Sequence, residues 1–108
     1  MIDKTCFNWV QLVKKSSGLE ANSKYIALYL ATFMNAEHDM AWPSLTRIAD
    51  ETGLSRPTIV KHINFLVDAG WLIKSKHLTT SGKGGTQQFN CYRMDIPTKV
   101  VKLLDLPK

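Results

Sequence analysis

Two short amphipathic patterns separated by one tight turn constrain the fold of this chain more than any other feature. The first pattern ends at Gly53, and its inward positions are Leu45, Ile48, Ala49 and Thr52. The second ends at Gly70, and its inward positions are Ile59, Ile63, Leu66 and Val67. The spacing i, i+3, i+4, i+7 places one apolar stripe on each of two helices. Two helices joined by so short a turn must cross steeply, so that one supports and the other projects outward.

Local signals at the ends of both helices support this prediction. Ser44 follows Pro43 and is a good N-cap for the first helix, and Gly53 supplies the positive φ that the turn requires. Ser55 is the expected N-cap of the second helix, which we expect to span residues 56–69. Because Pro57 has no N–H, the Ser55 hydroxyl must accept from the backbone of Thr58.

A hairpin is predicted directly after the second helix. Residues 71–77 have strand composition, residues 78–86 form a glycine-rich loop without acids, and residues 88–96 alternate. The alternation places Phe89, Cys91 and Arg93 on one face and Asn90, Tyr92, Met94 and Ile96 on the other. Residues 40–42 could add a short third strand.

With these elements the chain resembles the winged helix-turn-helix family. The residues that carry the resemblance read L-x-x-I-A-x-x-T-G-L-S-x-x-T-I-x-x-x-I-x-x-L-x-x-x-G-W-L, followed by a basic hairpin, the wing, and N-C-Y-R-M. The chain looks most like the winged-helix domains of phage and plasmid replication or regulatory proteins, over residues 20–96. The resemblance implies an α+β, mainly α fold, with a three-helix core and a small antiparallel wing.

The remaining segments complete one predicted domain spanning residues 1–108. A helix over residues 21–35, with Ile26, Tyr29, Leu30 and Phe33 inward, is the first of the three core helices. Residues 1–19 form an extension whose helix, residues 7–15, presents Phe7, Val10 and Val13, with Trp9 as a further candidate. Residues 97–108 are expected to form a short terminal helix that carries Val100, Val101, Leu103 and Leu104.

The charge distribution points to an anionic partner. The net charge is +5, and residues 43–108 carry all of this excess, with ten basic and five acidic residues. Neither the second helix between Leu54 and Val67 nor the segment from Trp71 to Met94 contains an acid. A basic surface on two elements that would face DNA is the expected electrostatic footprint, although lysines populate any protein surface.

The candidate DNA-binding residues follow from the helical wheel and the wing. At 100° per residue from Ile59, Pro57, Lys61 and Asn64 fall about 140–200° away, opposite the buried arc. Lys61, Asn64, Thr58 and Arg56 are therefore candidate base readers, and Pro57 and Thr58 suit a thymine methyl. Wing residues are expected to contact phosphates or the minor groove through residues 74–93. The full predicted set is Ser44, Ser55, Arg56, Pro57, Thr58, Lys61, Asn64, Lys74, Lys76, Lys83 and Arg93.

Three residues of the second helix, Asn64, His62 and Phe65, could have roles other than contacting DNA. An asparagine on a helix surface, such as Asn64, is more often only solvated, and His62 is expected to be a packed boundary residue. Phe65 should not be exposed on an isolated domain. It is expected under the wing, against the N-terminal helix or in a subunit contact.

Catalysis, cofactors and metals are not expected. His38, His62 and His77 are scattered, and the glycine-rich residues 81–85 lack the spacing of a phosphate-binding loop. Cys6 and Cys91 have no metal-ligand spacing and are expected to be reduced thiols in a cytoplasmic protein. The longest apolar run, residues 25–34, is too short to span a bilayer, and no small-molecule ligand is indicated.

The sequence is compatible with three functions. The first is a sequence-specific double-stranded DNA-binding transcriptional regulator, and the second is the DNA-binding module of a phage or plasmid replication initiator. The third is a winged helix used for protein contacts, a class that usually loses the basic residues that are retained here. A homodimer is possible, because the apolar terminal segments could form a two-fold interface as readily as they could cap the core.

Overall fold

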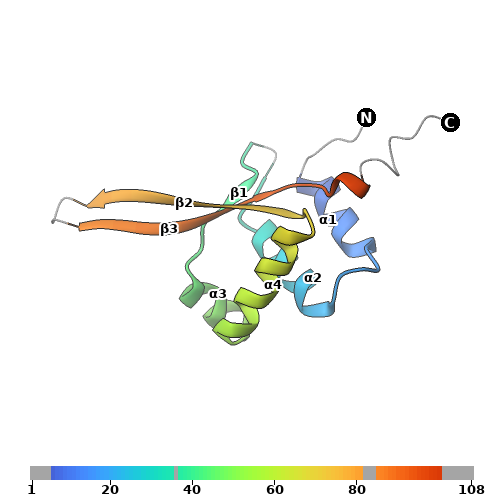
Figure 1. Ribbon diagram of the computed structural model, residues 1–108, viewed down its shortest axis with the longest axis horizontal. Coiled ribbons are helices and arrows are strands. Elements are labelled where there is room, and N and C mark those ends of the chain that lie inside the picture. The colour runs from blue at the N-terminus through green and yellow to red at the C-terminus, as the bar shows by residue number, and fades with distance from the viewer. Residues whose placement is uncertain (1–5, 36, 82–84, 101–108) are drawn as a thin grey trace.

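The computed structural model describes residues 6–35, 37–81 and 85–100, with four helices and three strands among them. The helices are α1 (Cys6–Lys15), α2 (Ala21–Ala31), α3 (Leu45–Thr52) and α4 (Arg56–Asp68). The strands β1 (Met40–Ala41), β2 (Leu72–Ser81) and β3 (Gly85–Met94) form an antiparallel sheet in the order β1-β3-β2. Figure 1 shows the helices gathered around one end of the β2–β3 hairpin, while its other end projects beyond them. The predicted α+β, mainly helical winged helix-turn-helix fold is confirmed.

The core lies where α1, α2, α3 and α4 meet the base of the sheet. Each of the four helices contributes at least one fully buried side chain, and the sheet contributes from the residues nearest its base. The largest fully buried side chains include Trp9, Val13, Ile26, Leu30, Ile48, Ile59, Ile63, Leu66 and Tyr92. Burial of these apolar surfaces at one junction fixes how the hairpin leaves the helices.

Helix α1 buries two of its predicted inward residues fully and a third only in part. Trp9 and Val13, one turn apart, are fully buried, whereas Val10 is only half-buried. The side chain of Phe7 lies outside the described residues. The large indole of Trp9 covers more apolar surface than Val10 can, and its N–H reaches two backbone carbonyls of the hairpin base.

Helix α2 ends earlier than residue 35. The N–H groups of Thr32, Phe33 and Met34 donate to carbonyls three residues back, at 3.0, 3.1 and 3.0 Å, which is the tighter 3₁₀ pattern. This tightening rotates Phe33 away from the α-helical stripe, so Tyr29 and Phe33 are half-buried and pack edge to face instead of lying fully inward.

The hairpin is longer than the sequence indicated. Residues 78–81 and 85–86, predicted as loop, belong to paired strands, and the register continues from Leu78↔Gln88 to Ser81↔Gly85. Backbone hydrogen bonds hold this ladder whatever the side chains are, and the β-branched Thr79, Thr80 and Thr86 favour strand conformation. Strand β3 ends at Met94, two residues before the predicted end, because its partner strand β2 begins at Leu72, which pairs with Met94.

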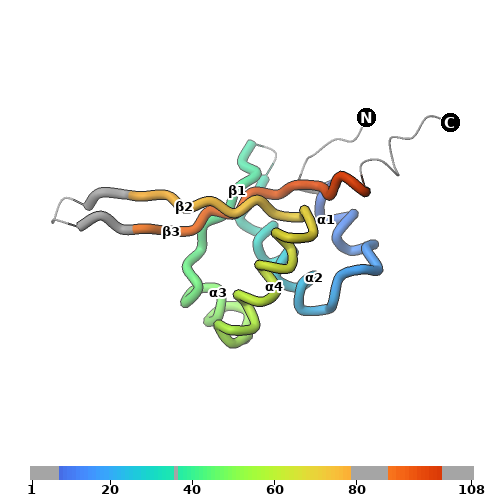
Figure 2. The backbone as a smooth tube through the Cα atoms, in the orientation of Figure 1, coloured from blue at the N-terminus to red at the C-terminus, as the bar shows by residue number. Residues whose placement is uncertain are grey.

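Paired residues share a face of the sheet, and the two faces differ. Leu72, Met94, Tyr92 and Ala41 are buried against the helices, so this is the inner face, and Lys74, Lys76, Asn90, Leu78 and Gln88 continue it along the wing. The outer face carries Ile73, Ser75 and His77 opposite Arg93, Cys91 and Phe89. The inner face therefore continues from the core into the wing. Figure 2 shows the backbone of β2 and β3 running from the helices out into the wing.

The chain leaves the hairpin close to the point where it entered. Gly70 has a φ of 92°, and a Cβ there would lie 3.1 Å from the Pro97 Cα atom. Thr98–Val100 are helical, and Val101, Leu103 and Leu104 of the predicted terminal helix lie outside the described residues.

Candidate nucleic-acid interface

The corner between α3 and α4 forms as the local sequence signals predicted. The Ser44 hydroxyl accepts from the Arg47 N–H at 3.0 Å, and the Ser55 hydroxyl accepts from the Thr58 N–H at 3.4 Å. Gly53 has a φ of 79°, and its N–H donates to the Ala49 carbonyl at 2.9 Å. The caps and the left-handed glycine start and stop each helix, so the start of α4 projects from the domain at a defined angle.

Helix α4 divides into a buried and an exposed side. Ile59, His62, Ile63 and Leu66 are buried. Most predicted DNA-binding residues of this helix are exposed, and Thr58 is half-buried. The exposed residues of the first three turns are Arg56, Pro57, Val60, Lys61, Asn64 and Phe65. The helix ends at Asp68, with Ala69 as its C-cap, one residue before the predicted end.

One exposed stripe of α4 faces the wing. Arg56, Val60 and Asn64 follow one another at intervals of four residues, so they lie one above the other on the helix. Val60 and Asn64 line a small depression together with Lys74 and Asn90 of the inner face. The structure therefore brings the predicted residues Asn64 and Lys74 together, from helix and wing respectively.

A larger depression, which we term the corner groove, continues this surface toward α3. It has a volume of about 270 Å³ and lies between the first turns of α3 and α4 and the outer part of β3. It is lined by Trp42, Pro43, Ser44, Leu45, Thr46, Arg56, Gln88, Phe89 and Asn90. Asn90 lines both depressions, so they form one continuous surface along the helix-turn-helix and the wing.

Arg56 is held within this groove. Its guanidinium Nη2 donates a hydrogen bond to the hydroxyl of Thr46 on the first turn of α3. The two helices are thus joined at their exposed ends by a charged side chain, in addition to their apolar contact. The bond also sets the direction in which the Arg56 side chain points.

The predicted basic residues of the wing separate into three groups. Lys74 and Lys76 are exposed on the inner face, beside the recognition surface. Lys83 lies outside the described residues. Arg93 lies at the base of the hairpin on the outer face, where its Nε is 3.7 Å from a carboxylate oxygen of Asp39. The structure does not bring Arg93 to the other candidates, because Arg93 lies on the opposite face of the sheet from Lys74 and Lys76.

The predicted site residues omit several that line the two depressions, among them Val60, Thr46, Gln88 and Asn90. Val60 was detectable, since it lies about 100° from Ile59 and is off the buried arc. Thr46, Gln88 and Asn90 carried no signal of this kind, because their positions depend on how β3 crosses the start of α3.

His62 is buried more deeply than the predicted boundary position. It is 5% exposed, and its Nδ1 lies 2.8 Å from the Ser23 hydroxyl and 3.7 Å from a carboxylate oxygen of Glu20. Because Ser23 is itself fully buried, this contact anchors the middle of α4 to α2. His62 belongs to the support of the recognition helix and not to its exposed surface.

Phe65 remains 43% exposed, so it lies neither under the wing nor against α1 as two of its predicted locations required. Its position about 240° from Ile59 carries it away from the core, which explains the exposure. Of the three predicted locations, a contact between subunits is the one that this exposure allows.

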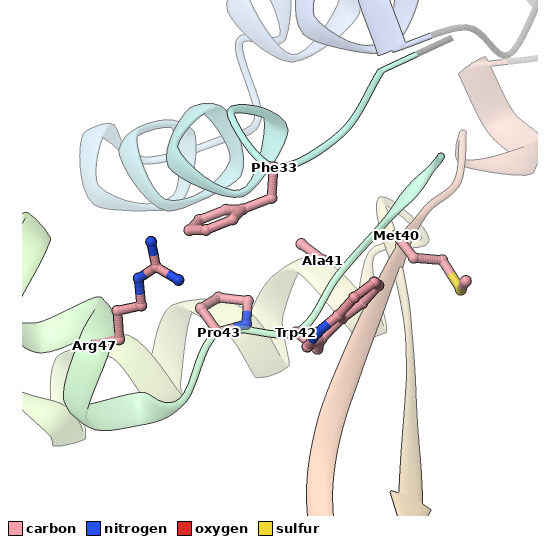
Figure 3. Close-up of a pocket in the computed structure, with 6 residues that line it drawn as sticks. All are labelled: Phe33, Met40, Ala41, Trp42, Pro43 and Arg47. Carbon is pink, nitrogen blue, oxygen red and sulfur yellow. The ribbon is translucent and has the colours of Figure 1, made fainter. Parts of the chain in front are cut away.

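A second pocket lies across Trp42 and Pro43 from the corner groove. It has a volume of about 160 Å³, and Figure 3 shows the Phe33 ring and the Arg47 guanidinium on one side of it and the segment from Met40 to Pro43 along the other. The Arg47 guanidinium carbon lies 4.8 Å from the Phe33 ring centroid, and its Nε lies 3.3 Å from both carboxylate oxygens of Glu51.

The acid that neutralises Arg47 also binds a tyrosine. The Tyr29 hydroxyl donates to Glu51 at 2.5 Å, which lowers the pKa of that carboxyl, with a further contribution from Arg47. Burial and this hydrogen bond raise the pKa of Tyr29 to about 12. Arg47 is therefore paired with an acid, whereas Arg56 in the corner groove hydrogen-bonds to a neutral hydroxyl.

The described residues were also considered for metal binding, for a reactive thiol and for a membrane-spanning helix. No group of three or more potential metal ligands occurs among them. Cys91 is free and buried, and burial raises the pKa of its thiol, which disfavours the reactive thiolate. Within the same residues, no helix has the length and apolarity needed to cross a membrane.

Comparison with known proteins gives a family match over the region that includes α3 and α4. Residues 17–72 match the model of a protein family described as a helix-turn-helix domain. The match covers just over half of the chain, from the segment before α2 to the first residue of β2. No curated protein matches the chain.

Proposed function

The chain belongs to the helix-turn-helix domain family, and on that premise we propose that it is a sequence-specific double-stranded DNA-binding protein that regulates transcription. In this proposal α4 enters the major groove, whose dimensions admit one helix, and the wing contacts phosphates or the adjacent minor groove.

The observation that carries the proposal is the continuous surface between α4 and the inner face of the wing. Asn90 joins its two depressions, and Arg56 and Lys74 are the charged residues among those that line them. Lys61 and Lys76 lie exposed on the same two elements. A concave surface with basic side chains and amides on two projecting elements suits a grooved polyanion.

The exposed side of α4 offers a chemically varied set of base contacts. Lys61 suits the acceptors of guanine, and the Asn64 amide suits the paired donor and acceptor of adenine. Pro57, Thr58 and Val60 suit the methyl group of thymine. Each good contact of this kind discriminates against a wrong base by about 1–3 kcal/mol.

Salt dependence tests whether this surface binds DNA. If one subunit neutralises about four to six phosphates, the logarithm of the association constant should fall with the logarithm of salt concentration with a slope near −4 to −5. An affinity for duplex DNA that does not change between low and physiological salt would contradict the DNA-facing role of the wing.

Genome-wide occupancy tests the biological output. A transcriptional regulator should occupy promoter regions, whereas a phage or plasmid replication initiator would use the same surface at repeats within one origin. We propose no catalytic step and no cofactor for this protein, since DNA recognition uses the exposed groups of the surface and needs neither.

A further inference from the structure

The corner groove is lined by groups that suit an anion whose oxygens accept hydrogen bonds. Among its lining residues, all of them within the described part of the chain, Arg56 is the only charged one. The other polar side-chain groups are the hydroxyls of Ser44 and Thr46, the amides of Gln88 and Asn90, and the indole N–H of Trp42. A phosphodiester carries one negative charge and several acceptor oxygens, so these donors complement it.

The orientation of Arg56 favours a phosphate over a base edge. An arginine that reads guanine presents its fork to two acceptors in the major groove. The Arg56 guanidinium instead already donates one of its N–H groups to Thr46 and is thereby drawn over α3, into the groove. Its remaining N–H groups can donate hydrogen bonds to a phosphate that lies in the groove.

Asn90 forms the opposite wall of the groove and is itself half-buried. On the same face of β3, two residues along, lies Tyr92, which is 1% exposed and belongs to the core. Asn90 also lines the small depression beside Asn64, so the groove ends where the base-facing stripe of α4 begins. A DNA strand in the groove would therefore pass directly beside the bases that α4 contacts.

We propose that the corner groove holds the sugar–phosphate backbone of one DNA strand between α4 and the wing, with Arg56 as a phosphate clamp and Thr46 and Asn90 as positioning residues. This inference rests on the proposed function and deepens it. It changes the predicted role of Arg56 from base reading to backbone binding, and it leaves base discrimination to residues farther along α4.

The test neutralises single phosphates of the bound DNA. The full chain is titrated against a preferred duplex and against versions of it in which one phosphate at a time is replaced by an uncharged methylphosphonate. We expect wild-type affinity to fall at a phosphate flanking the bases that α4 contacts. Arg56→Ala should weaken binding to the natural duplex, lower the salt slope by about one, and no longer respond to that same replacement.

Two further variants make the test specific. Asn90→Ala should weaken binding several-fold without changing the salt slope, because it removes a neutral donor. Arg47→Ala is the matched control, since Arg47 is also an exposed arginine of this corner but lies in the neighbouring pocket, paired with Glu51. It should leave both the salt slope and the methylphosphonate pattern unchanged. Circular dichroism verifies that each variant is folded.

The outcomes separate this inference from the proposed function. If wild-type protein prefers particular duplexes but Arg56→Ala changes the preferred bases and keeps the methylphosphonate response, Arg56 is a base reader and the clamp is wrong. Unchanged binding by Arg56→Ala would likewise overturn it. If wild-type protein shows no sequence preference at all, the proposed function itself fails.

Discussion

The indole N–H of Trp9 lies 3.0 Å from the backbone carbonyl of Trp71, a residue 62 positions later in the chain. The same N–H lies 2.9 Å from the carbonyl of Asp95, so α1 holds both the entrance and the exit of the hairpin. The N-terminal helix therefore uses its largest side chain for the fold. The predicted alternative, in which this face forms a two-fold interface, does not apply to Trp9 and Val13, which are fully buried within one chain.

Replacing Trp9 should destabilise the protein substantially. Trp9→Phe removes both hydrogen bonds and leaves unfilled volume in the core, so we expect the free energy of unfolding to fall by about 2–4 kcal/mol. Urea denaturation measures the change. Trp42→Phe is the control, because Trp42 is 56% exposed and its replacement should shift the free energy by less than about 0.5 kcal/mol. Equal effects of the two variants would contradict the anchoring role of Trp9.

The wing lysines should position the protein without selecting a sequence. Lys76→Ala and Lys83→Ala should weaken binding to all duplexes about equally and lower the salt slope by roughly one each. Lys15→Ala, on the exposed side of α1, is a lysine control that should leave the slope unchanged. A change in preferred sequence in either wing variant would assign a base contact to the wing.

The exposed residues of α4 should select the sequence. Lys61→Ala and Asn64→Ala should each relax the preference at a particular base pair, by about 1–3 kcal/mol. Selection of binding sites from random duplexes, followed by sequencing, detects this directly. Preferences identical to those of wild type in both variants would show that α4 is not the reading element.

The contact between Tyr29 and Glu51 should shape the pH dependence of stability. The pKa of folded Glu51 lies below its ordinary value, so its contribution is present above the ordinary value and is lost as pH falls through the folded pKa. The pKa of Tyr29 rises from 10.0 to about 12, so its contribution is complete below pH 10.0 and is lost as pH rises toward about 12.

Tyr29→Phe should therefore flatten both limbs of a plot of unfolding midpoint against pH. Tyr25→Phe is the control, since the Tyr25 hydroxyl donates to the Thr52 carbonyl and not to a carboxylate. Parallel curves for wild type and Tyr29→Phe across the whole pH range would show that the hydrogen bond to Glu51 does not contribute to stability in solution.

The remaining subunit hypothesis concerns Phe65. We propose that this exposed ring lies in a two-fold contact, so light scattering at micromolar concentration should give a dimer mass and Phe65→Ser a monomer mass. The preferred duplex should then be a palindrome with half-sites about one helical turn apart. A monomer mass for wild type together with a non-palindromic footprint would exclude this assembly.

The amino-acid sequence by itself determined the corner of the helix-turn-helix. Ser44, Gly53, Ser55 and the spacing of Ile59, Ile63 and Leu66 act through residues no more than a few positions away, so caps, turn and buried stripe could all be predicted. The composition after Gly70 likewise predicted a hairpin.

Only the tertiary structure decided how these elements form one surface. The extended ladder of the wing, the bond from Arg56 to Thr46 and the ion pair of Arg93 with Asp39 join residues that are distant or unrelated in sequence pattern. The position of Asn90 between two depressions depends on how β3 crosses α3. Local periodicity and capping carry no information on such contacts, because packing of the whole core sets them. The sequence therefore predicted which helix projects, and the tertiary structure determined which side chains accompany it.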